Sequence, residues 1–407
     1  MKEEYRGEHL TKKKGKRYLH EVDLMRVIFI GGVLLNHTTT AFKSSMSSNS
    51  FSKLFLESTH LSLHFTRMGF MFMTGLVLVL NYYHLENNWF SFWKKRYTNV
   101  GIPYLSWNAI IMLLTTIFAG GTIIWSDYWN HLLDAWLHGN EYYMYYIIVT
   151  FQLYLIFPLI IKMFKKFEDH HLMILGISAL LQMVITFSIK YLLPGVDRSG
   201  WPYLFKAYGL NVFTYQFYFI AGAFVAIHYD AFDEFVERFH KLIGWITATL
   251  ALGTVGIFYF DQRVLKLGMD GTLSIHQPFI FVYDVAMIVF VFWIGRQYTH
   301  AREAGLPIWI DKLIKNLSKV SFGLYLVQSL PILMLYKILS LLNVSSWVML
   351  VMLPLGYAFV LGGAFVISWF CYKVPPFGIL IGRPQKFKRS VLNAKNNQAI
   401  KPAMDEQ

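Results

Sequence analysis

The chain has 407 residues, of which 55% are apolar and 15% are charged, and its mean hydropathy is +0.41. These values exclude an ordinary water-soluble globular protein and indicate a membrane protein. The single cysteine excludes an intramolecular disulfide framework and a cysteine-rich metal site. The net charge of +13 would suit nucleic acid, but the basic residues are distributed as in a membrane topology, so no nucleic-acid partner is predicted.

Ten apolar stretches of membrane-spanning length predict an all-α, polytopic integral membrane protein with about ten transmembrane helices. They lie at residues 21–40, 63–83, 98–119, 142–161, 171–193, 211–229, 242–260, 278–295, 318–341 and 346–372. We divide the chain into a basic tail (1–17), a transmembrane domain (18–375) and a second basic tail (376–407). No segment between the helices is long enough to fold as a separate soluble domain.

The basic residues orient these helices. If the N-terminus is cytoplasmic, the inner segments hold roughly three times as many Lys and Arg residues as the outer ones. The outer loop 120–141 contains three acidic residues and no Lys or Arg. Both tails are therefore predicted to be cytoplasmic.

The first apolar stretch carries ionisable residues along one face. Arg26 and His37 are eleven positions apart, close to three full turns at about 100° per residue, so both side chains project from nearly the same face. They are separated by about 16 Å along the axis, roughly half of the hydrocarbon core. Asp23 lies three residues before Arg26 and can pair with it. Because ionisable groups at membrane depth are costly, this polar stripe indicates a pathway or a reaction site.

The same stretch resembles the N-terminal signature of an enzyme family. In that signature a helix entry with acidic residues ends in an Arg, and a His follows after ten intervening residues. Here these residues are Glu21-Val22-Asp23-Leu24-Met25-Arg26 and His37. Later segments resemble further motifs in the same chain order: Phe70 to Gly75, Lys94-Lys95-Arg96 with Pro103-Tyr104, Tyr142 to Pro158, and Ser321 to Leu326. Over about residues 18–375 the chain resembles the acyltransferase 3 family, integral membrane O-acyltransferases of bacterial surface polysaccharides. The resemblance implies one transmembrane domain with a polar cavity lined by the first helix.

His37 is the strongest catalytic candidate. Imidazole can act as a general base near neutral pH, or it can carry the acyl group itself. The alternative is a histidine at the membrane interface that only hydrogen-bonds Asn36 or lipid headgroups. Glu141 and Asp284 are two candidate carboxylates that would orient the imidazole, as the acid does in hydrolase triads. Glu141 stands where the family often has a histidine, and it is also explained as an acid at a helix N-terminus.

Arg26, Lys95 and Arg96 are assigned to the phosphates of an acyl-coenzyme A, with Asp23 beside Arg26. Two alternatives stay open. Asp23 and Arg26 would also serve as a purely structural pair, because an arginine inside a span must be paired. The cluster that Lys94 begins is also explained as ordinary positive-inside charge.

Two further outer features carry weaker signals. The loop 194–209 is rich in aromatic and short polar residues, which suit either a sugar acceptor or an interfacial aromatic belt. Among the outer histidines, His60 and His64 have i, i+4 spacing, but no cysteine or ordered carboxylate nearby completes a ligand set. No metal site is therefore predicted. The late helix has Gln328 where the family often has a histidine.

The predicted function is transfer of an acyl group, acetyl or succinyl, from cytoplasmic acyl-CoA to a hydroxyl of an extracytoplasmic polysaccharide or lipid-linked glycan. Acetyl-CoA is the expected donor, and no metal is expected. The resemblance implies the donor, the acceptor class and a location in the bacterial plasma membrane, with membrane lipid, the glycan and glycan synthase or export proteins as partners. Two other interpretations stay open: an exporter of polysaccharide or lipid-linked sugar, and a catalytically inactive assembly subunit.

Overall fold

The computed structural model describes residues 18–385, and the two predicted tails therefore lie mostly outside the described residues. Within that range the chain is helical and contains no strand. The α-helices are α1 (His20–Ser45), α2 (Phe51–His60), α3 (Phe65–Tyr82), α4 (Trp89–Phe118), α5 (Trp125–His138), α6 (Tyr145–Lys166), α7 (His171–Phe187), α8 (Tyr203–Lys206), α9 (Gln216–Ile227), α10 (Tyr229–Arg263), α11 (Met269–Thr272), α12 (Pro278–Glu303), α13 (Ile308–Val327), α14 (Ser329–Leu341) and α15 (Ser346–Lys373). Short helical turns lie between them, of which η1 (Leu61–Leu63), η5 (Tyr208–Leu210), η6 (Val212–Tyr215) and η7 (Phe377–Ile381) matter below.

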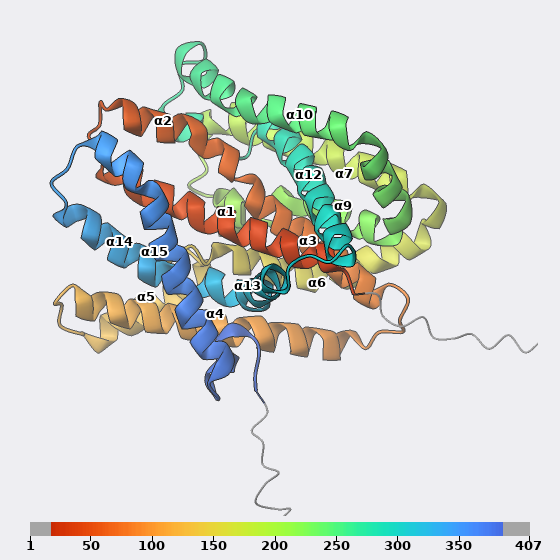
Figure 1. The fold of residues 1–407 in the computed structure, drawn as a ribbon, viewed down its shortest axis with the longest axis horizontal. Coiled ribbons are helices and arrows are strands. Elements are labelled where there is room, and N and C mark those ends of the chain that lie inside the picture. The colour runs from red at the N-terminus through yellow and green to blue at the C-terminus, as the bar shows by residue number, and fades with distance from the viewer. Residues whose placement is uncertain (1–17, 386–407) are drawn as a thin grey trace, which may run out of the picture.

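Helices stand at all ten predicted positions, and Figure 1 shows most of the long ones running along one common direction. Between residues 18 and 385, seven helical segments are long and apolar enough to cross a membrane, or eight if α13 and α14, which meet at a bend of 59°, form one span. The two remaining positions are α1, which carries the polar stripe, and α9, which has only 12 residues. The prediction of an all-α polytopic membrane protein is confirmed.

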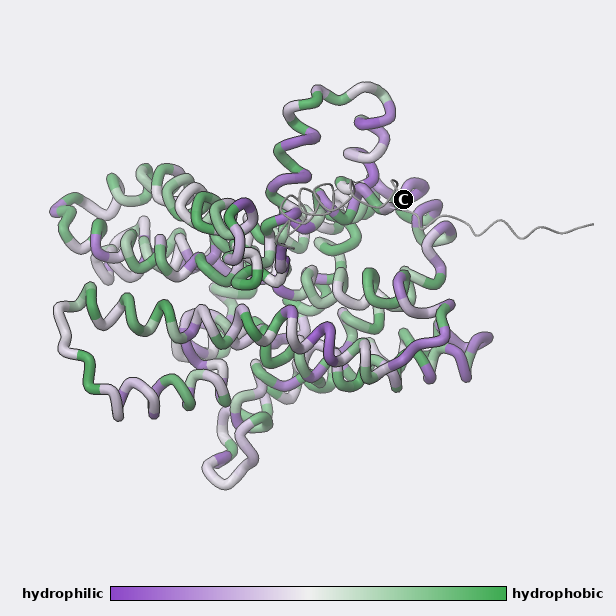
Figure 2. The backbone as a smooth tube through the Cα atoms, turned by 90° about the horizontal axis from the view of Figure 1, so that it is seen from below, coloured by the Kyte–Doolittle hydropathy of each residue, from purple (hydrophilic) through white to green (hydrophobic). Residues whose placement is uncertain are grey.

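The surface of the helical bundle is apolar. Large hydrophobic side chains are exposed along the outer helices, for example Leu155 on α6, Leu172 on α7, Leu252 on α10 and Leu355 on α15. Figure 2 shows many hydrophobic positions along the helices, while hydrophilic positions gather largely at turns and helix ends. An apolar surface is favourable in contact with lipid and unfavourable in contact with water. Because polar side chains facing lipid would be costly, they lie inside the bundle instead.

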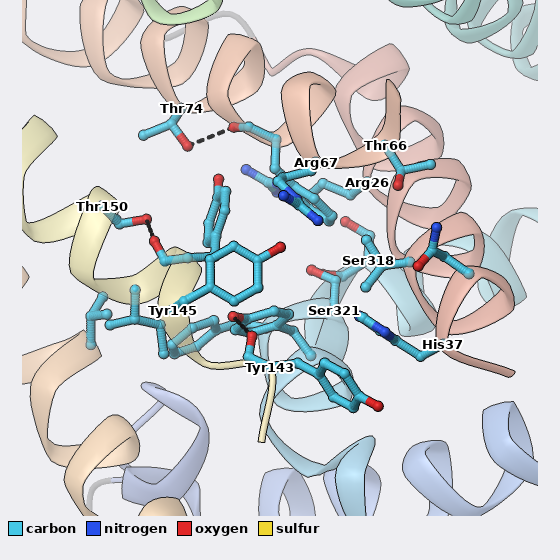
Figure 3. Close-up of a pocket in the computed structure, with 18 of the residues that line it drawn as sticks. Arg26, His37, Thr66, Arg67, Thr74, Tyr143, Tyr145, Thr150, Ser318 and Ser321 are labelled. Atoms are coloured by element: carbon cyan, nitrogen blue, oxygen red, sulfur yellow. Dashed lines mark hydrogen bonds between the residues drawn. The ribbon is translucent and has the colours of Figure 1, made fainter. Parts of the chain in front are cut away.

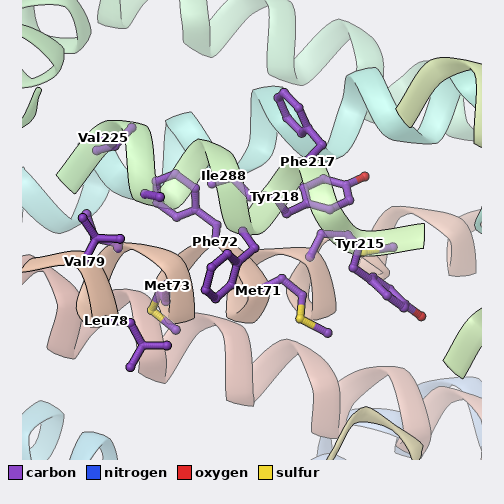
Figure 4. Close-up of a cluster of buried hydrophobic side chains, with 14 of the residues drawn as sticks. Met71, Phe72, Met73, Leu78, Val79, Tyr215, Phe217, Tyr218, Val225 and Ile288 are labelled. Carbon is purple, nitrogen blue, oxygen red and sulfur yellow. The ribbon is translucent and has the colours of Figure 1, made fainter. Parts of the chain in front are cut away.

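The closest helix packing joins α3 to α9. A Cβ at Gly75 would overlap the carbonyl oxygen of Phe219, and a Cβ at Gly222 would overlap that of Phe72. Small residues allow two backbones in a membrane to approach until van der Waals packing is dense. Figure 4 shows the result, with aromatic and methionine side chains from both helices packed together in the larger of the two main cores.

α1 lies inside the bundle, against α3, α12, α13, α14 and α15. Its first turn is held by hydrogen bonds rather than by a cap. Buried Glu21 accepts hydrogen bonds from the hydroxyl of Tyr229 on α10 and from that of Thr299 on α12. Asp23 accepts them from Tyr18 (2.7 Å) and from Ser318 on α13 (2.6 Å). The acidic entry to this helix therefore fixes its depth and rotation relative to its neighbours.

The chain continues past α15 into a packed segment. The indole N–H of Trp107 on α4 donates to the carbonyl oxygen of Leu380 in η7 at 2.8 Å. Gly382 has a left-handed backbone (φ 67°) and lies so close to Asn99 that a Cβ would overlap its carbonyl oxygen. Residues 377–385, which we assign from the sequence to the C-terminal tail, thus lie against α4 and present Arg383 to the interior.

Candidate active site

A cavity of about 330 Å³ lies between α1, α3, α4, α6 and α13. Figure 3 shows side chains from these helices pointing toward one another across it. Its polar lining residues are Arg26, Asn36, His37, His64, Thr66, Arg67, Thr74, Arg96, Tyr143, Tyr145, Tyr146, Thr150, Tyr154, Ser318, Lys319, Ser321, Tyr325 and Arg383. Arg26 and His37, three turns apart on one unbroken helix, therefore face the same space.

One end of the cavity is cationic. Arg26, Arg96, Lys319 and Arg383 line it, and no Asp or Glu within residues 18–385 does so. Arg26 and Arg383 both act on Tyr18: burial raises the pKa of its hydroxyl to about 12, with Asp23 adding to the rise and the two guanidinium groups opposing it. Four cations from α1, α4, α13 and the segment after η7 thus converge where a polyanion would be attracted.

Arg96 is held by aromatic rings. Its guanidinium carbon lies 5.7 Å from the ring centres of Tyr82 and Phe92 and 5.9 Å from that of Tyr154, within the range of cation–π attraction. Its Nε is buried and has no hydrogen-bond partner within the described part of the chain. The side chain is therefore positioned without its donors being used up. Lys95, in contrast, is exposed and does not line the cavity.

Asp23 does not line the cavity either. Its carboxylate is occupied by the hydroxyls of Tyr18 and Ser318, and among the ion pairs of residues 18–385 there is none between Asp23 and Arg26. Ser318 itself lines the cavity. Asp23 thus fixes α13 against α1 and leaves the Arg26 guanidinium available to a ligand.

His37 is positioned by an aromatic stack. Its ring lies on that of Tyr143, with centres 3.8 Å apart and planes inclined by 28°. Tyr142 and Tyr143 both have positive φ angles, 52° and 63°, a conformation that costs bulky residues energy and persists only where the surroundings enforce it.

Two hydroxyls from the late helices hold this strained turn. Tyr325 donates to the carbonyl oxygen of Tyr143 at 2.6 Å, and Ser329 donates to that of Tyr142 at 3.0 Å. Tyr325 belongs to the Ser321–Leu326 motif identified in the sequence. That motif therefore acts, at least in part, by positioning the aromatic partner of His37.

Further histidines surround the same end of the cavity. The amide of Asn36 lies 3.5 Å from Nε2 of His64, and the rings of His60 and His64 meet edge to face at 5.0 Å. The hydroxyl of Thr39 is 3.3 Å from Nδ1 of His60. These groups form a polar network behind His37. Within residues 18–385 no three His, Cys, Asp or Glu side chains are gathered as a metal-binding group.

The structure brings neither candidate carboxylate to His37. Glu141 lies in the turn before α6, which begins at Tyr145, and does not line the cavity. Asp284 is fully buried on α12, where its Oδ2 accepts a hydrogen bond from Tyr218 at 3.1 Å. Its Oδ1 has no partner within the described residues. Tyr143 stacks on the imidazole instead, and His64 and Arg67 line the same cavity.

Arg67 is the most prominent cavity residue that the sequence analysis passes over. It comes from the start of α3, and its guanidinium carbon lies 4.8 Å from the ring centre of Tyr145. A signal was present, since Arg67 and His64 both stand inside the apolar stretch 63–83, and ionisable residues inside a span mark functional sites. Lys319 and Arg383 gave no such signal, because the charge bias explains basic residues at cytoplasmic helix ends.

Comparison with known families decides the class of protein. A family model described as an acyltransferase domain, acyltransferase 3, matches residues 19–373. The chain belongs to the acyltransferase 3 family. Membership spans the whole transmembrane bundle and confirms the resemblance identified from the motifs. Neither the comparison with curated proteins nor that with solved structures found a match.

This acyltransferase 3 protein is therefore a multi-pass membrane enzyme that transfers acyl groups. The last helix, α15, ends at Lys373, which is also the last residue of the family match. The packed segment that carries Arg383 lies just beyond that residue. The cavity contains both kinds of group that acyl transfer from an anionic donor needs: cations for the donor and an imidazole for the chemistry.

Proposed function

We propose that the enzyme transfers an acyl group, acetyl or succinyl, from cytoplasmic acyl-CoA to a hydroxyl of an extracytoplasmic polysaccharide or lipid-linked glycan. One observation carries the proposal: a single cavity is lined by Arg26 and Arg96 and, three helical turns from Arg26 along α1, by His37. With the orientation that the basic residues predict, the cationic end faces the cytoplasm, where acyl-CoA is found.

The donor is assigned to the cationic end. Coenzyme A carries phosphates, and guanidinium groups bind phosphate through paired, charge-assisted hydrogen bonds. Arg26, Arg96, Lys319 and Arg383 supply four positive charges that no acidic lining residue neutralises within the described chain. The thioester arm of the donor would then run along α1 toward His37.

His37 is assigned as the general base. A ring nitrogen takes the proton of the acceptor hydroxyl as its oxygen attacks the thioester carbonyl carbon. The new C–O ester bond forms, the C–S bond breaks, and the coenzyme A thiolate leaves and takes a proton from the imidazolium. If His37 instead carries the acyl group, its nitrogen attacks first and the acceptor oxygen displaces it in a second step. Tyr143 fixes the ring plane in both cases.

The proposal places the protein in the bacterial plasma membrane, with the acceptor arriving from the outer side. Glycan synthase or export proteins are the expected partners, because they would deliver the acceptor.

The purified protein in lipid nanodiscs, incubated with radiolabelled acetyl-CoA and a bacterial surface polysaccharide as acceptor, tests the function. We expect release of coenzyme A that is lost in His37→Ala and kept in His131→Ala, which changes an exposed histidine on α5 outside the cavity. Arg96→Gln should raise the KM for acetyl-CoA by roughly tenfold, as for loss of one charge-assisted contact, whereas Lys312→Gln at the exposed start of α13 should not. Coenzyme A release that survives His37→Ala would refute the proposal, as would glycan export into vesicles that this substitution leaves unchanged.

A further inference from the structure

A second pocket, of about 440 Å³, opens beside the active-site cavity. We call it the outer pocket; its lining residues come from the start of the loop after α5 (Gly139, Asn140), from α8 and η5 (Tyr203, Lys206, Tyr208) and from the wall shared with the cavity. That wall consists of Arg67 and Tyr145, which line both spaces. The two spaces therefore share the side chains of Arg67 and Tyr145, which lie together in Figure 3.

The charge of the outer pocket is positive. Arg67 and Lys206 line it, and within residues 18–385 no Asp or Glu does. Lys206 is exposed and takes part in no ion pair among those residues. Two acids near the pocket accept local hydrogen bonds.

One of these acids is Asp197. It accepts hydrogen bonds from the backbone N–H of Ser199 (2.9 Å) and from its hydroxyl (3.1 Å), and these bonds lower the pKa of the carboxyl group. The other is Asp134, which accepts from Asn140 (2.9 Å) and contacts the His138 ring nitrogen (2.7 Å). Both carboxylates accept hydrogen bonds from their own neighbours. Asp197 also interacts electrostatically with Lys206, so a ligand anion would compete with Asp197 for that charge.

The remaining walls are aromatic. Tyr203, whose hydroxyl donates to the carbonyl oxygen of His138 at 3.2 Å, joins α8 to the end of α5. Arg198 lies over the ring of Tyr208 at 5.6 Å, and one of its terminal nitrogens is buried without a hydrogen-bond partner in the described chain. Aromatic faces with a few placed polar groups are typical of small-molecule sites, and sugar rings pack well on such faces.

We propose that the outer pocket is the acceptor subsite, and that it selects a sugar bearing an anionic group, a carboxylate or a phosphate. The anion binds Lys206 and Arg67, the sugar ring packs on Tyr203 and Tyr208, and the hydroxyl to be acylated reaches His37 past the Arg67–Tyr145 wall. This inference rests on the proposed function, because it takes an acceptor hydroxyl as the second substrate. It extends that function by specifying that the acceptor is anionic and that Lys206 recognises its charge.

Three soluble probes test the inference with the nanodisc enzyme and labelled acetyl-CoA: methyl glucoside, methyl glucuronoside and glucose phosphate. The first is neutral, the second carries a carboxylate, and the third carries a phosphate. We expect the label to move to at least one charged probe with a KM at least about tenfold lower than for the neutral sugar. The comparison between the two charged probes identifies which anion is preferred.

Substitutions at Lys206 complete the test. Lys206→Gln should remove the preference for the charged probe, and Lys206→Arg should keep it. Lys337→Gln, on the exposed face of α14 and outside both pockets, is the matched control and should behave as the native enzyme. If Lys206→Gln fails to fold, Lys206→Arg and the probe comparison in the native enzyme still decide the question.

The failure of this inference differs from failure of the proposed function. Equal transfer to neutral and charged probes, or transfer to none of them while His37-dependent coenzyme A release continues, overturns the anionic subsite and leaves the acyltransferase proposal standing. Loss of His37 dependence overturns the function itself.

Discussion

Tyr325→Phe is expected to impair catalysis without touching His37. The substitution removes the hydroxyl that holds the carbonyl oxygen of Tyr143 at 2.6 Å and keeps the aromatic ring. Losing that bond and leaving the carbonyl without its donor costs about 1–3 kcal/mol. The turn is already strained by the positive φ angles of Tyr142 and Tyr143, at about 1–3 kcal/mol each. Release of this strain favours a change of backbone conformation when the bond is lost.

The expected magnitude follows from this penalty. If Tyr143 no longer stacks on His37 once the turn relaxes, the imidazole occupies its reactive orientation less often. The free energy lost with the hydrogen bond then appears as a lower kcat. At about 1.4 kcal/mol per tenfold change, kcat should fall by roughly 5- to 150-fold, with little change in the KM for the donor. The assay is His37-dependent coenzyme A release by nanodisc protein whose folding is checked by size-exclusion chromatography and thermal unfolding.

Ser329→Ala separates this explanation from a direct role of the Tyr325 hydroxyl in the cavity. Ser329 does not line the cavity but holds the neighbouring carbonyl of Tyr142 at 3.0 Å. The Ser329→Ala substitution should therefore also lower kcat, but by a smaller factor of about threefold to tenfold. A folded Tyr325→Phe protein with native kcat would refute the positioning argument. A large loss in Tyr325→Phe with none in Ser329→Ala would assign Tyr325 to the chemistry rather than to the turn.

Three further outcomes are expected. Gly75→Ala should reduce the folded yield and lower the unfolding temperature, because the added Cβ overlaps the α9 backbone, whereas Gly176→Ala, with open space around it, should be neutral in the same thermal assay. Lys190→Met should destabilise the protein by about 3–5 kcal/mol, because it leaves the Asp261 carboxylate buried without its partner at 2.5 Å; a stability equal to the native protein would contradict this. Arg383→Gln should raise the KM for acetyl-CoA by about threefold to tenfold at unchanged kcat, and an unchanged KM would remove this residue from the donor site.

Within a single helix, the helical repeat was sufficient to predict which side chains share a face. The spacing of Arg26 and His37 predicts a shared face because the α-helix repeats every 3.6 residues, and α1 runs unbroken through both positions. Apolar length likewise located helices at all ten predicted positions, since a hydrocarbon layer demands helices of that length. Family membership could be recognised because the motifs retain their chain order.

Between helices, the sequence was much less informative. Glu141 and Asp284 looked like partners of His37 because their helices were expected to open on the same side, yet neither lines the cavity. The actual neighbour, Tyr143, sits in a left-handed turn that helix periodicity does not anticipate, and the helix begins only at Tyr145. The turn is held by hydroxyls nearly two hundred residues away, at Tyr325 and Ser329.

By itself, then, the sequence determined the protein class, the family, the helices and the polar face of α1, because each of these depends on residues that are neighbours along one segment. Only the tertiary structure decided which side chains meet that face. Arg67, Tyr143 and Arg383 come from three different segments, and their convergence depends on how closely and at what rotation the helices pack. Those packing geometries are set by contacts such as Gly75 against Phe219, between residues far apart in the sequence, where no local repeat reveals them.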